Sequence, residues 1–267
     1  MPLHANAASV PRAVAINVGA NTSLPGVRAP VHPDGSFAYV PIPEREPVGE
    51  SVPTYADLQV SIDVPEPYRD APVHLDPEFA SYPYCEAYTY GDDHGVKAAP
   101  LLSLDAGDVV AFYATLETVD HGAGASTPPR SLASIPGGES TVDEPDWRPP
   151  SWGAYVIGAF VLDRDPIDPA AYEALPAPER ERLANNAHVK REPIDAEVFV
   201  LGDPDRSALF ERAVPLSAPS AGVDANALVT ELSADSGAGP WWRRPLRFDR
   251  AGTESLLELL ARPVAPQ

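Results

Sequence analysis

The sequence is poor in cysteine, in lysine and in long apolar runs. Cys85 is the single cysteine among 267 residues, so no disulfide can form within the chain. Lysine occurs only as Lys97 and Lys190, and all the other basic residues are arginines. No apolar run approaches the roughly 20 residues that a membrane-spanning helix requires. These absences exclude a disulfide-stapled domain, and we expect a protein that does not enter a membrane.

Familiar targeting and catalytic motifs are missing too. The first residues contain no basic stretch followed by a long apolar segment, so we expect no secretory signal and a cytoplasmic location. The sequence also lacks a Walker loop and the GxGxxG, CxxC, HExxH and GxSxG motifs. A familiar NTPase, dinucleotide-dependent dehydrogenase, zinc protease or serine hydrolase is therefore not expected.

Acidic residues are abundant. The chain has 39 acidic and 19 basic residues, which gives a formal net charge of −20. Together with the scarcity of lysine, this composition is typical of a halophilic protein; the alternative is an ordinary acidic protein with a solvated face. At molar salt the Debye length is about 3 Å, and little free energy comes from counterion release. The charge therefore does not exclude nucleic acid, but binding would depend on stacking and hydrogen bonds in a pocket.

Proline is also abundant, with 33 residues, and it interrupts most segments, so few long helices are expected. The apolar segments Asp108–Leu116 and Ala154–Leu162 predict two buried strands. Shorter strands are predicted at Val14–Val18, Phe37–Pro43 and Glu197–Leu201.

Three short helices complete the predicted elements. An aspartate followed by proline, the usual N-cap and first helical position, predicts helices within 168–187 and 203–213. Leucines at helical spacing predict a closing helix at Thr253–Ala261. We expect one α+β domain over 1–267, built on a small curved mixed sheet or partly open β-barrel with long proline-rich loops. A flexible insertion is expected at about 118–150 and a linker at about 216–239.

Two pairs of polar residues are the first candidates for chemistry. Asp57, beside Tyr55 in a proline-rich loop, could accept hydrogen bonds from a base edge or act as a general base, or it could close a turn. His74 and Asp76 share one side of an extended segment because alternate residues point the same way. They could form a histidine oriented by a carboxylate or part of a metal site, for which His188 is the plausible third ligand; the alternative is a surface or capping pair.

Two arginine-containing segments are candidates for binding anions. Arg206 and Ser207 follow the predicted helix start at 203, where free amide groups attract phosphate; Arg206 could instead pair with nearby acids. Trp242 and Arg243 belong to the one basic and aromatic stretch of the chain, residues 241–250, which would suit a phosphate beside a stacked base. The alternative is that a tryptophan caps the core while the arginines form local ion pairs.

These candidates have different expected roles. We expect catalytic roles for Asp57, His74 and Asp76. The expected nucleotide- or phosphate-binding residues are Tyr55, His188, Arg206, Ser207, Trp242 and Arg243. The spacing of these residues predicts no metal site, and it points to no particular cofactor.

An ordered set of short motifs spans nearly the whole chain. The motifs of this set are Pro33–Gly35, Pro41–Glu44, Thr54–Leu58, His74–Pro77, Gly107-Asp108, Gly153–Phe160, Asn186–His188, Gly202–Ser207, Trp242 and Pro245-Leu246. In this order the chain resembles the third type of nucleotide modification associated domain, as a haloarchaeal-like member. The Gly-Asp turn at 107 and the glycine-containing strand near Gly158 are also similar to PUA-like barrels, including EVE and ASCH domains.

The resemblance implies a function in nucleic-acid base modification. Members of that family are inferred to act with DNA base-modification systems, so the implied partner is nucleic acid or a nucleotide. Enzyme and non-catalytic reader of modified bases both stay open. The second hypothesis is an adaptor that docks on a modification enzyme. Convergence of the candidate residues on one polar cleft would favour the first hypothesis, and scattering them over the surface would favour the second.

Overall fold

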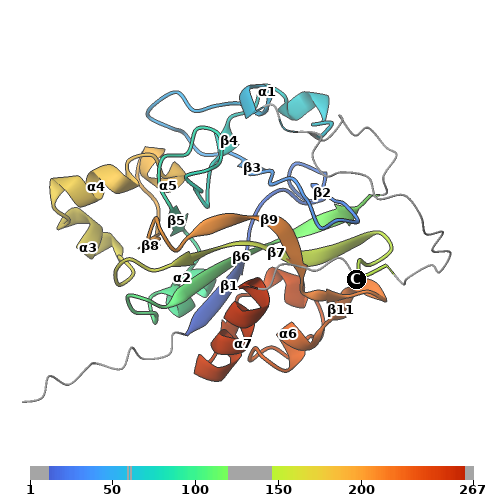
Figure 1. Ribbon diagram of the computed structural model, residues 1–267. Coiled ribbons are helices and arrows are strands. Elements are labelled where there is room, and N and C mark those ends of the chain that lie inside the picture. The colour runs from blue at the N-terminus through green and yellow to red at the C-terminus, as the bar shows by residue number, and fades with distance from the viewer. Residues whose placement is uncertain (1–11, 59, 61, 120–145, 262–267) are drawn as a thin grey trace, which may run out of the picture.

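The structure is a computed structural model that describes residues 12–58, 60, 62–119 and 146–261 (Figure 1). Its centre is a mixed sheet of 6 strands, in which β2 lies beside one end of β6. The order of the other strands across the sheet is β12 (Leu246–Phe248), β1 (Ala13–Asn17), β6 (Val109–Thr118), β7 (Trp152–Val161) and β9 (Ala208–Pro215), and β2 is Pro30–Val31.

Strand β6 is the middle of this sheet. It runs parallel to β1 and antiparallel to β7. Val110 and Phe112 pack into the core on one face of the sheet, whereas Val109 and Ala111 pack into the core on the other. Because both faces are covered, the strand is apolar almost throughout rather than alternating. The predicted strands at Asp108–Leu116 and Ala154–Leu162 are thereby confirmed.

Gly158 allows β7 to bend where three segments crowd together. The pairing of β6 with β7 shifts register between Phe112 and Tyr113, which marks a bulge beside this glycine. A Cβ atom at Gly158 would lie 2.6 Å from the Phe79 side chain and 2.7 Å from the Ala208 carbonyl oxygen. Close packing of this kind is a usual reason for glycine inside a strand.

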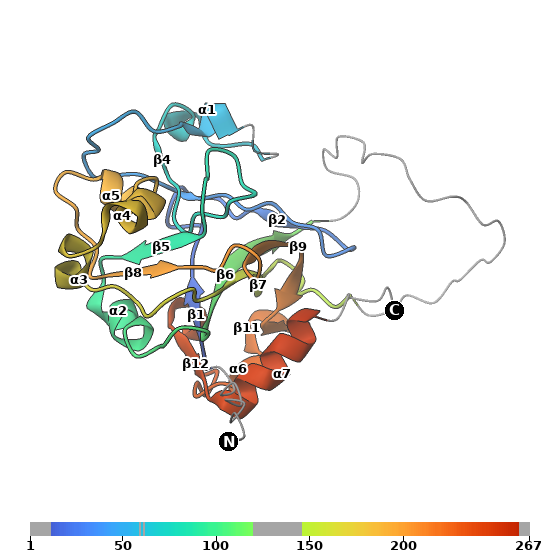
Figure 2. The ribbon, with the colours of Figure 1, turned by 60° about the vertical axis from the view of Figure 1, so that its left-hand side comes forward.

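Smaller pairs of strands lie beside the sheet. Strand β5 (Thr89–Asp92) pairs antiparallel with β8 (Val198–Leu201), and β3 (Ile42–Pro43) pairs antiparallel with β4 (Val73–His74). Figure 2 shows β5 and β8 next to the helices α4 and α5. A third pair joins β10 (Ser217–Ala218) to β11 (Ala221–Ala225).

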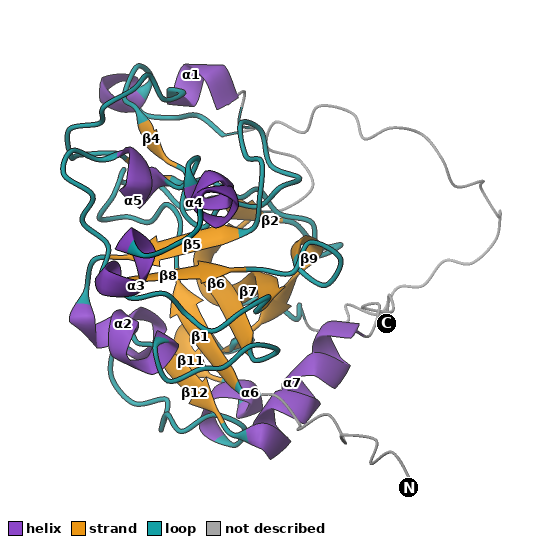
Figure 3. Ribbon diagram, turned by 90° about the vertical axis from the view of Figure 1, so that its left-hand side faces the viewer, coloured by secondary structure: helices purple, strands orange, loops and turns teal. Residues whose placement is uncertain are grey.

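The helices are short, and all but α1 and α2 form two groups (Figure 3). One group, α3, α4 and α5, lies beside β5 and β8. The other, α6 and α7, covers the face of the sheet near β12. The bounds are α1 Tyr55–Leu58, α2 Gly95–Leu101, α3 Pro169–Glu173, α4 Ala177–Leu183, α5 Ala187–Lys190, α6 Ala227–Thr230 and α7 Arg250–Ala261, with 3₁₀ turns at Glu66–Tyr68 and Trp241–Arg243.

The α+β class is confirmed, and none of the described sheets closes into a barrel. The helix predicted within 203–213 is wrong. Residues 203–206 form a turn, in which the Asp205 amide donates to the Asp203 carboxylate at 2.9 Å, and β9 follows. Pairing of β9 with β7 determines this structure, because tertiary contacts override the local propensity of an aspartate-proline start.

Other expectations are met in part. Of the strand predicted at Phe37–Pro43, only β3 forms. The helical stretch within 168–187 divides into α3 and α4, and Asp168 caps α3 as predicted by accepting the Ala171 amide at 2.7 Å. The stretch 216–239, expected as a linker, contains β10, β11 and α6. Most of the insertion expected at 118–150 lies outside the described residues.

Candidate functional site

A cavity of about 320 Å³ lies where the end of β1 meets β4, β5 and α5. Three of the predicted site residues, His74, Asp76 and His188, line it together. They come from β4, from the loop after β4 and from α5. Residues that are far apart in the sequence thus form one polar pocket, whereas the other six predicted site residues do not line it.

His74 is fixed by a carboxylate behind its ring. In the β3–β4 pair, His74 lies opposite Ile42, and this pairing brings Glu44 beside the imidazole. The His74 Nδ1 atom is 2.7 Å from Glu44 Oε2. An ionised carboxylate accepts a hydrogen bond from Nδ1–H, so in the neutral imidazole the lone pair is on the other ring nitrogen, Nε2.

His188 is held in the same way. The Asn186 side chain caps α5 by accepting the His188 amide at 3.0 Å, which fixes the start of this short helix. The His188 Nδ1 atom is 2.8 Å from Asp195 Oδ1. The rings of His74 and His188 lie edge to face with their centroids 4.8 Å apart.

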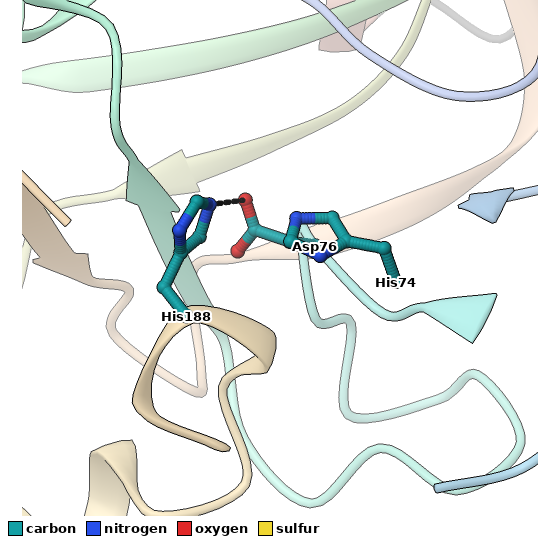
Figure 4. Close-up of side chains that lie close together, drawn as sticks. All are labelled: His74, Asp76 and His188. Carbon is teal, nitrogen blue, oxygen red and sulfur yellow. Dashed lines mark ion pairs between the residues drawn. The ribbon is translucent and has the colours of Figure 1, made fainter. Parts of the chain in front are cut away.

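Asp76 faces both histidines from the loop after β4. Its Oδ1 atom accepts the Gly91 amide at 2.9 Å and the Asn186 side-chain amide at 2.8 Å. Its Oδ2 atom lies 3.9 Å from His188 Nε2 (Figure 4). Burial raises the pKa of Asp76 well above its usual value, because the loss of solvation of the carboxylate outweighs the hydrogen bonds from Gly91 and Asn186.

Arg191 ties the supporting carboxylates together. Its guanidinium lies 2.9 Å from Glu44 Oε1 and 2.7 Å from Asp195 Oδ2. Burial alone would raise the pKa of Glu44, but hydrogen bonds from His74 and Arg191 outweigh it and lower that pKa far below the ordinary value. Glu44 is therefore ionised across the physiological range, as the orientation of His74 requires.

The charge state of His188 follows from its burial. Desolvation and the neighbouring His74 lower the pKa of His188 to about 4, although Asp195 opposes the shift. At neutral pH the imidazole is uncharged, and its Nε2 lone pair faces the cavity side of the cluster. An uncharged imidazole can accept a proton or bind a metal ion.

Further polar groups surround the cluster. Asn17 lines the cavity, and its buried Nδ2 atom has no hydrogen-bond partner among the described residues. Asp92 accepts the hydroxyl of Tyr90 and lies 3.1 Å from Lys97 Nζ. Unpaired buried donors are rare in folded proteins, so Asn17 marks a position where a ligand could be recognised.

A larger hollow of about 430 Å³ lies elsewhere on the surface, between the end of β7 and α4. Four of its charged groups are already paired, Arg164 with Glu179 and Arg182 with Asp163, and Asp165 accepts the Ala106 amide at 2.9 Å. Ion pairs of this exposure are common on protein surfaces and have little consequence. The hollow therefore offers no free chemical group that compares with the histidine cluster.

Tyr55 and Asp57 lie outside the cavity. The Tyr55 side chain is buried, and its hydroxyl donates to the Pro41 carbonyl oxygen at 2.7 Å. The Asp57 carboxylate is exposed and accepts the amide and the hydroxyl of Thr54, each at 2.8 Å. These contacts give both residues structural tasks: Tyr55 anchors α1, and Asp57 closes the turn that begins it.

The segment of Arg206 and Ser207 does not open a helix, so it has no helix N-terminus to bind an anion. Arg206 is exposed in the turn before β9, and its amide donates to the Asp203 carbonyl oxygen. The buried Ser207 hydroxyl accepts the Val161 amide at 3.2 Å. Neither residue lines the cavity.

Trp242 and Arg243 belong to a separate aromatic cluster. Trp242 packs edge-on against Trp152 with the ring centroids 5.3 Å apart, and Arg28 lies 4.3 Å from the Trp152 ring centroid. Trp241 is fully buried, as in the interpretation of a tryptophan that caps the core. Arg243 is exposed, and the stretch contributes nothing to the lining of the cavity.

The sequence pattern alone assigns no role to Glu44, Arg191 or Asp195, which support the histidines. Glu44 was available as the end of the Pro41–Glu44 motif, and Arg191 and Asp195 closely follow His188 in the sequence. The role of Glu44 depends on contacts across 30 positions to His74 and 147 positions to Arg191. Spacing along the sequence contains no sign of such pairing.

Comparison with known proteins gives one match. The family model described as nucleotide modification associated domain 3 matches residues 12–258. The chain belongs to this family, which indicates a role in nucleotide modification systems. No curated protein and no solved structure matches. In the described part of the chain, no helix is long and apolar enough to cross a membrane.

Proposed function

We propose that the protein accepts a single nucleobase in the cavity and acts on it as an enzyme of a nucleic-acid modification system. The observation that carries this proposal is the convergence of His74, Asp76 and His188 in one buried pocket. Family membership supplies the context of nucleotide modification.

The size of the cavity favours one base over a longer segment. Its volume of about 320 Å³ lies at the small end of the range of roughly 300–1,000 Å³ for small-molecule sites. A base within a duplex would reach such a pocket only after extrusion from the stack, as in other enzymes that modify bases. Free bases and nucleosides are the alternative substrates of the same chemistry.

The charge of the cavity favours the base over the phosphate. Five carboxylates lie in or directly behind it, whereas the cations there are Lys97 and Arg191; the carboxylates are Glu44, Asp76, Asp92, Asp93 and Asp195. Even with Asp76 uncharged, as its raised pKa favours, the carboxylates outnumber the cations, so an anionic phosphate would be repelled from such a site. The uncharged base, with its donors and acceptors, is the part of a nucleotide that fits these surroundings.

The two histidines support catalysis more than simple recognition. Each imidazole has a carboxylate at Nδ1, which orients the ring and favours the tautomer whose Nε2 lone pair is available. A general base needs this arrangement, whereas a reader of bases needs only donors, acceptors and a stacking surface. The enzyme form therefore explains more of the observed contacts than the reader form does.

Binding in molar KCl tests the proposal. Calorimetric titration with free bases, nucleosides, nucleotides and single-stranded oligonucleotides, plain and modified, should show binding of at least one base-containing ligand. Asp76→Asn should weaken that binding or abolish turnover, whereas Asp57→Asn, outside the cavity, should match the wild type. The absence of binding by every ligand, or an equal effect of the two substitutions, would contradict the proposal.

A further inference from the structure

We propose that His74 Nε2, His188 Nε2 and Asp76 Oδ2 form a binding site for one divalent first-row transition-metal ion, with its remaining coordination positions open to the cavity. The role of this ion rests on the proposed function, but its binding does not. Each of the three residues has a ligand atom within 4.8 Å of a ligand atom of the other two, and all three residues are buried.

The ligand atoms of the three residues point toward one another but form no hydrogen bond with one another. The distance from His188 Nε2 to Asp76 Oδ2 is 3.9 Å, too long for a hydrogen bond. Two ligand atoms bound about 2.1 Å from one ion stand about 3.4 Å apart in tetrahedral geometry. A contraction of about an ångström would therefore complete the site, which side-chain rotations can supply.

Each ligand is oriented by a second group. Glu44 holds His74 at Nδ1, Asp195 holds His188 at Nδ1, and these contacts leave both Nε2 atoms to bind. On Asp76, the Gly91 and Asn186 amides occupy Oδ1 and leave Oδ2. A carboxylate behind a ligating histidine is the usual second layer of metal sites.

The ligand set indicates the type of ion. Two imidazoles and one carboxylate suit zinc, iron, manganese or cobalt, whereas magnesium and calcium prefer oxygen atoms alone. Three protein ligands also leave positions for water or substrate, which distinguishes catalytic from structural sites. A bound ion would supply Lewis-acid activation of water or of a base carbonyl group.

Neighbouring groups favour a cation but do not compete for it. A second acidic group, Asp92 with Asp93 and His94, is partly exposed, and Asp92 is already bonded to Tyr90 and Lys97. A third group would need His188 Nδ1, which faces Asp195 and Arg191 at 2.8 and 3.3 Å. Among the groups in the described part of the chain, the cluster of His74, Asp76 and His188 is therefore the one whose ligand atoms are not already bonded elsewhere.

Metal stoichiometry and affinity test this inference. Protein stripped with a chelator and then dialysed is titrated in molar KCl with Zn²⁺, Co²⁺, Mn²⁺ and, without oxygen, Fe²⁺, and the bound metal is counted by plasma mass spectrometry. We expect one equivalent of at least one ion. His74→Ala, Asp76→Asn and His188→Ala should each weaken its binding by about 100-fold or more.

His94→Ala is the matched control, because His94 lines the same cavity outside the cluster. It should bind the metal as the wild type does. Should the ligand variants fail to fold, the visible spectrum of the Co²⁺-loaded wild-type protein decides, since imidazole and carboxylate ligation differs from that of aqueous Co²⁺.

Three outcomes would overturn the inference: no bound metal, an aqueous-type Co²⁺ spectrum, or a loss of affinity in His94→Ala equal to that in His74→Ala. The outcome for the proposed function is separate. Metal binding without any base binding would contradict the proposed function alone, whereas base binding by a protein that takes up no metal would contradict the metal site alone.

Discussion

His74 and His188 depend on the charged residues that hold their Nδ1 atoms. Arg191 is central to this support, since it joins the carboxylates of Glu44 and Asp195 behind the two rings. Its side chain is only 9% exposed, so its ionic partners are screened little by solvent. The cluster is thus a network in which the loss of one charge leaves others buried and unpaired.

Replacement of Arg191 should therefore be costly. We expect Arg191→Met to lower the free energy of unfolding by about 3 kcal/mol or more, because breaking a buried ion pair leaves uncompensated charge. Urea unfolding followed by tryptophan fluorescence measures this value. The exposed Arg206→Met is the control and should change it by at most about 0.5 kcal/mol. Equal effects of the two substitutions would show that the network contributes no stability.

The reactivity of the single thiol, Cys85, can be predicted separately. Burial and the nearby Glu78 raise the pKa of Cys85 to about 12, so the reactive thiolate is scarce at pH 8. Labelling of the folded protein by iodoacetamide should be roughly 10³-fold slower than labelling of free cysteine, and its rate should rise with pH. The unfolded protein should react at the ordinary rate. Rapid labelling of the folded protein at pH 8 would contradict the burial of this thiol.

At the scale of elements, β5 and α5 bring the parts of the site together. Gly91 on β5 is the contact point, since a Cβ atom there would lie 2.8 Å from His188 Cδ2 and 3.1 Å from Asn186 Oδ1. Glycine thus allows α5 to lie close against the strand. The same residue donates its amide to Asp76, so one backbone position controls two sides of the cluster.

Gly91→Ala should displace His188 while leaving the core intact. We expect the affinity for metal to fall roughly 10- to 100-fold, as for other changes in the support of a ligand, with an unchanged far-ultraviolet circular dichroism spectrum. Gly95→Ala is the control, because a Cβ atom at Gly95 would meet nothing within 4 Å. Wild-type metal affinity in Gly91→Ala would mean that the position of α5 does not matter to the site.

The elements also show what the sequence could predict. Apolar runs without alternation predicted β6 and β7, since a strand covered on both faces needs no polar side. The aspartate-proline start predicted α3 correctly at Asp168 and a helix wrongly at Asp203, where pairing with β7 produces β9. The local signal is the same at both sites, and only the tertiary partner differs.

The candidate site, like the elements, could be predicted from the sequence only in part. Alternation along an extended segment placed His74 and Asp76 on one side, and His188 followed as the plausible third ligand. The carboxylate of Glu44, which orients His74, reaches that histidine only after β3 pairs with β4. Such contacts follow from tertiary structure, and spacing in the sequence does not contain them.

At the scale of the whole molecule, the net charge of −20 has to be tolerated by the fold. Salt shortens the Debye length from about 10 Å at 0.1 M to about 3 Å at 1 M, which removes most repulsion between surface carboxylates. We predict that the thermal unfolding temperature, followed by circular dichroism, rises as KCl increases over this range. A constant or falling unfolding temperature would contradict adaptation of this chain to high salt.

The acidic surface and the acidic cavity lead to the same expectation about ligands. Neither attracts phosphate, so recognition of a nucleotide would rest on its base, and a bound cation would offset the excess of carboxylates around His74 and His188. Family membership points to nucleotide modification. Within the described part of the chain, the cavity is where a base could contact groups that transfer a proton or bind a metal ion.

The most direct measurement is the binding of nucleosides to the metal-loaded protein and to its Asp76→Asn variant in molar KCl, with the bound nucleoside identified by mass spectrometry. We predict that the wild-type protein retains at least one plain or modified nucleoside and that the variant loses it, while His94→Ala still binds metal. Retention of the same nucleoside by Asp76→Asn with unchanged affinity, or retention of none by the wild-type protein, would contradict the assignment of this cavity as the functional site.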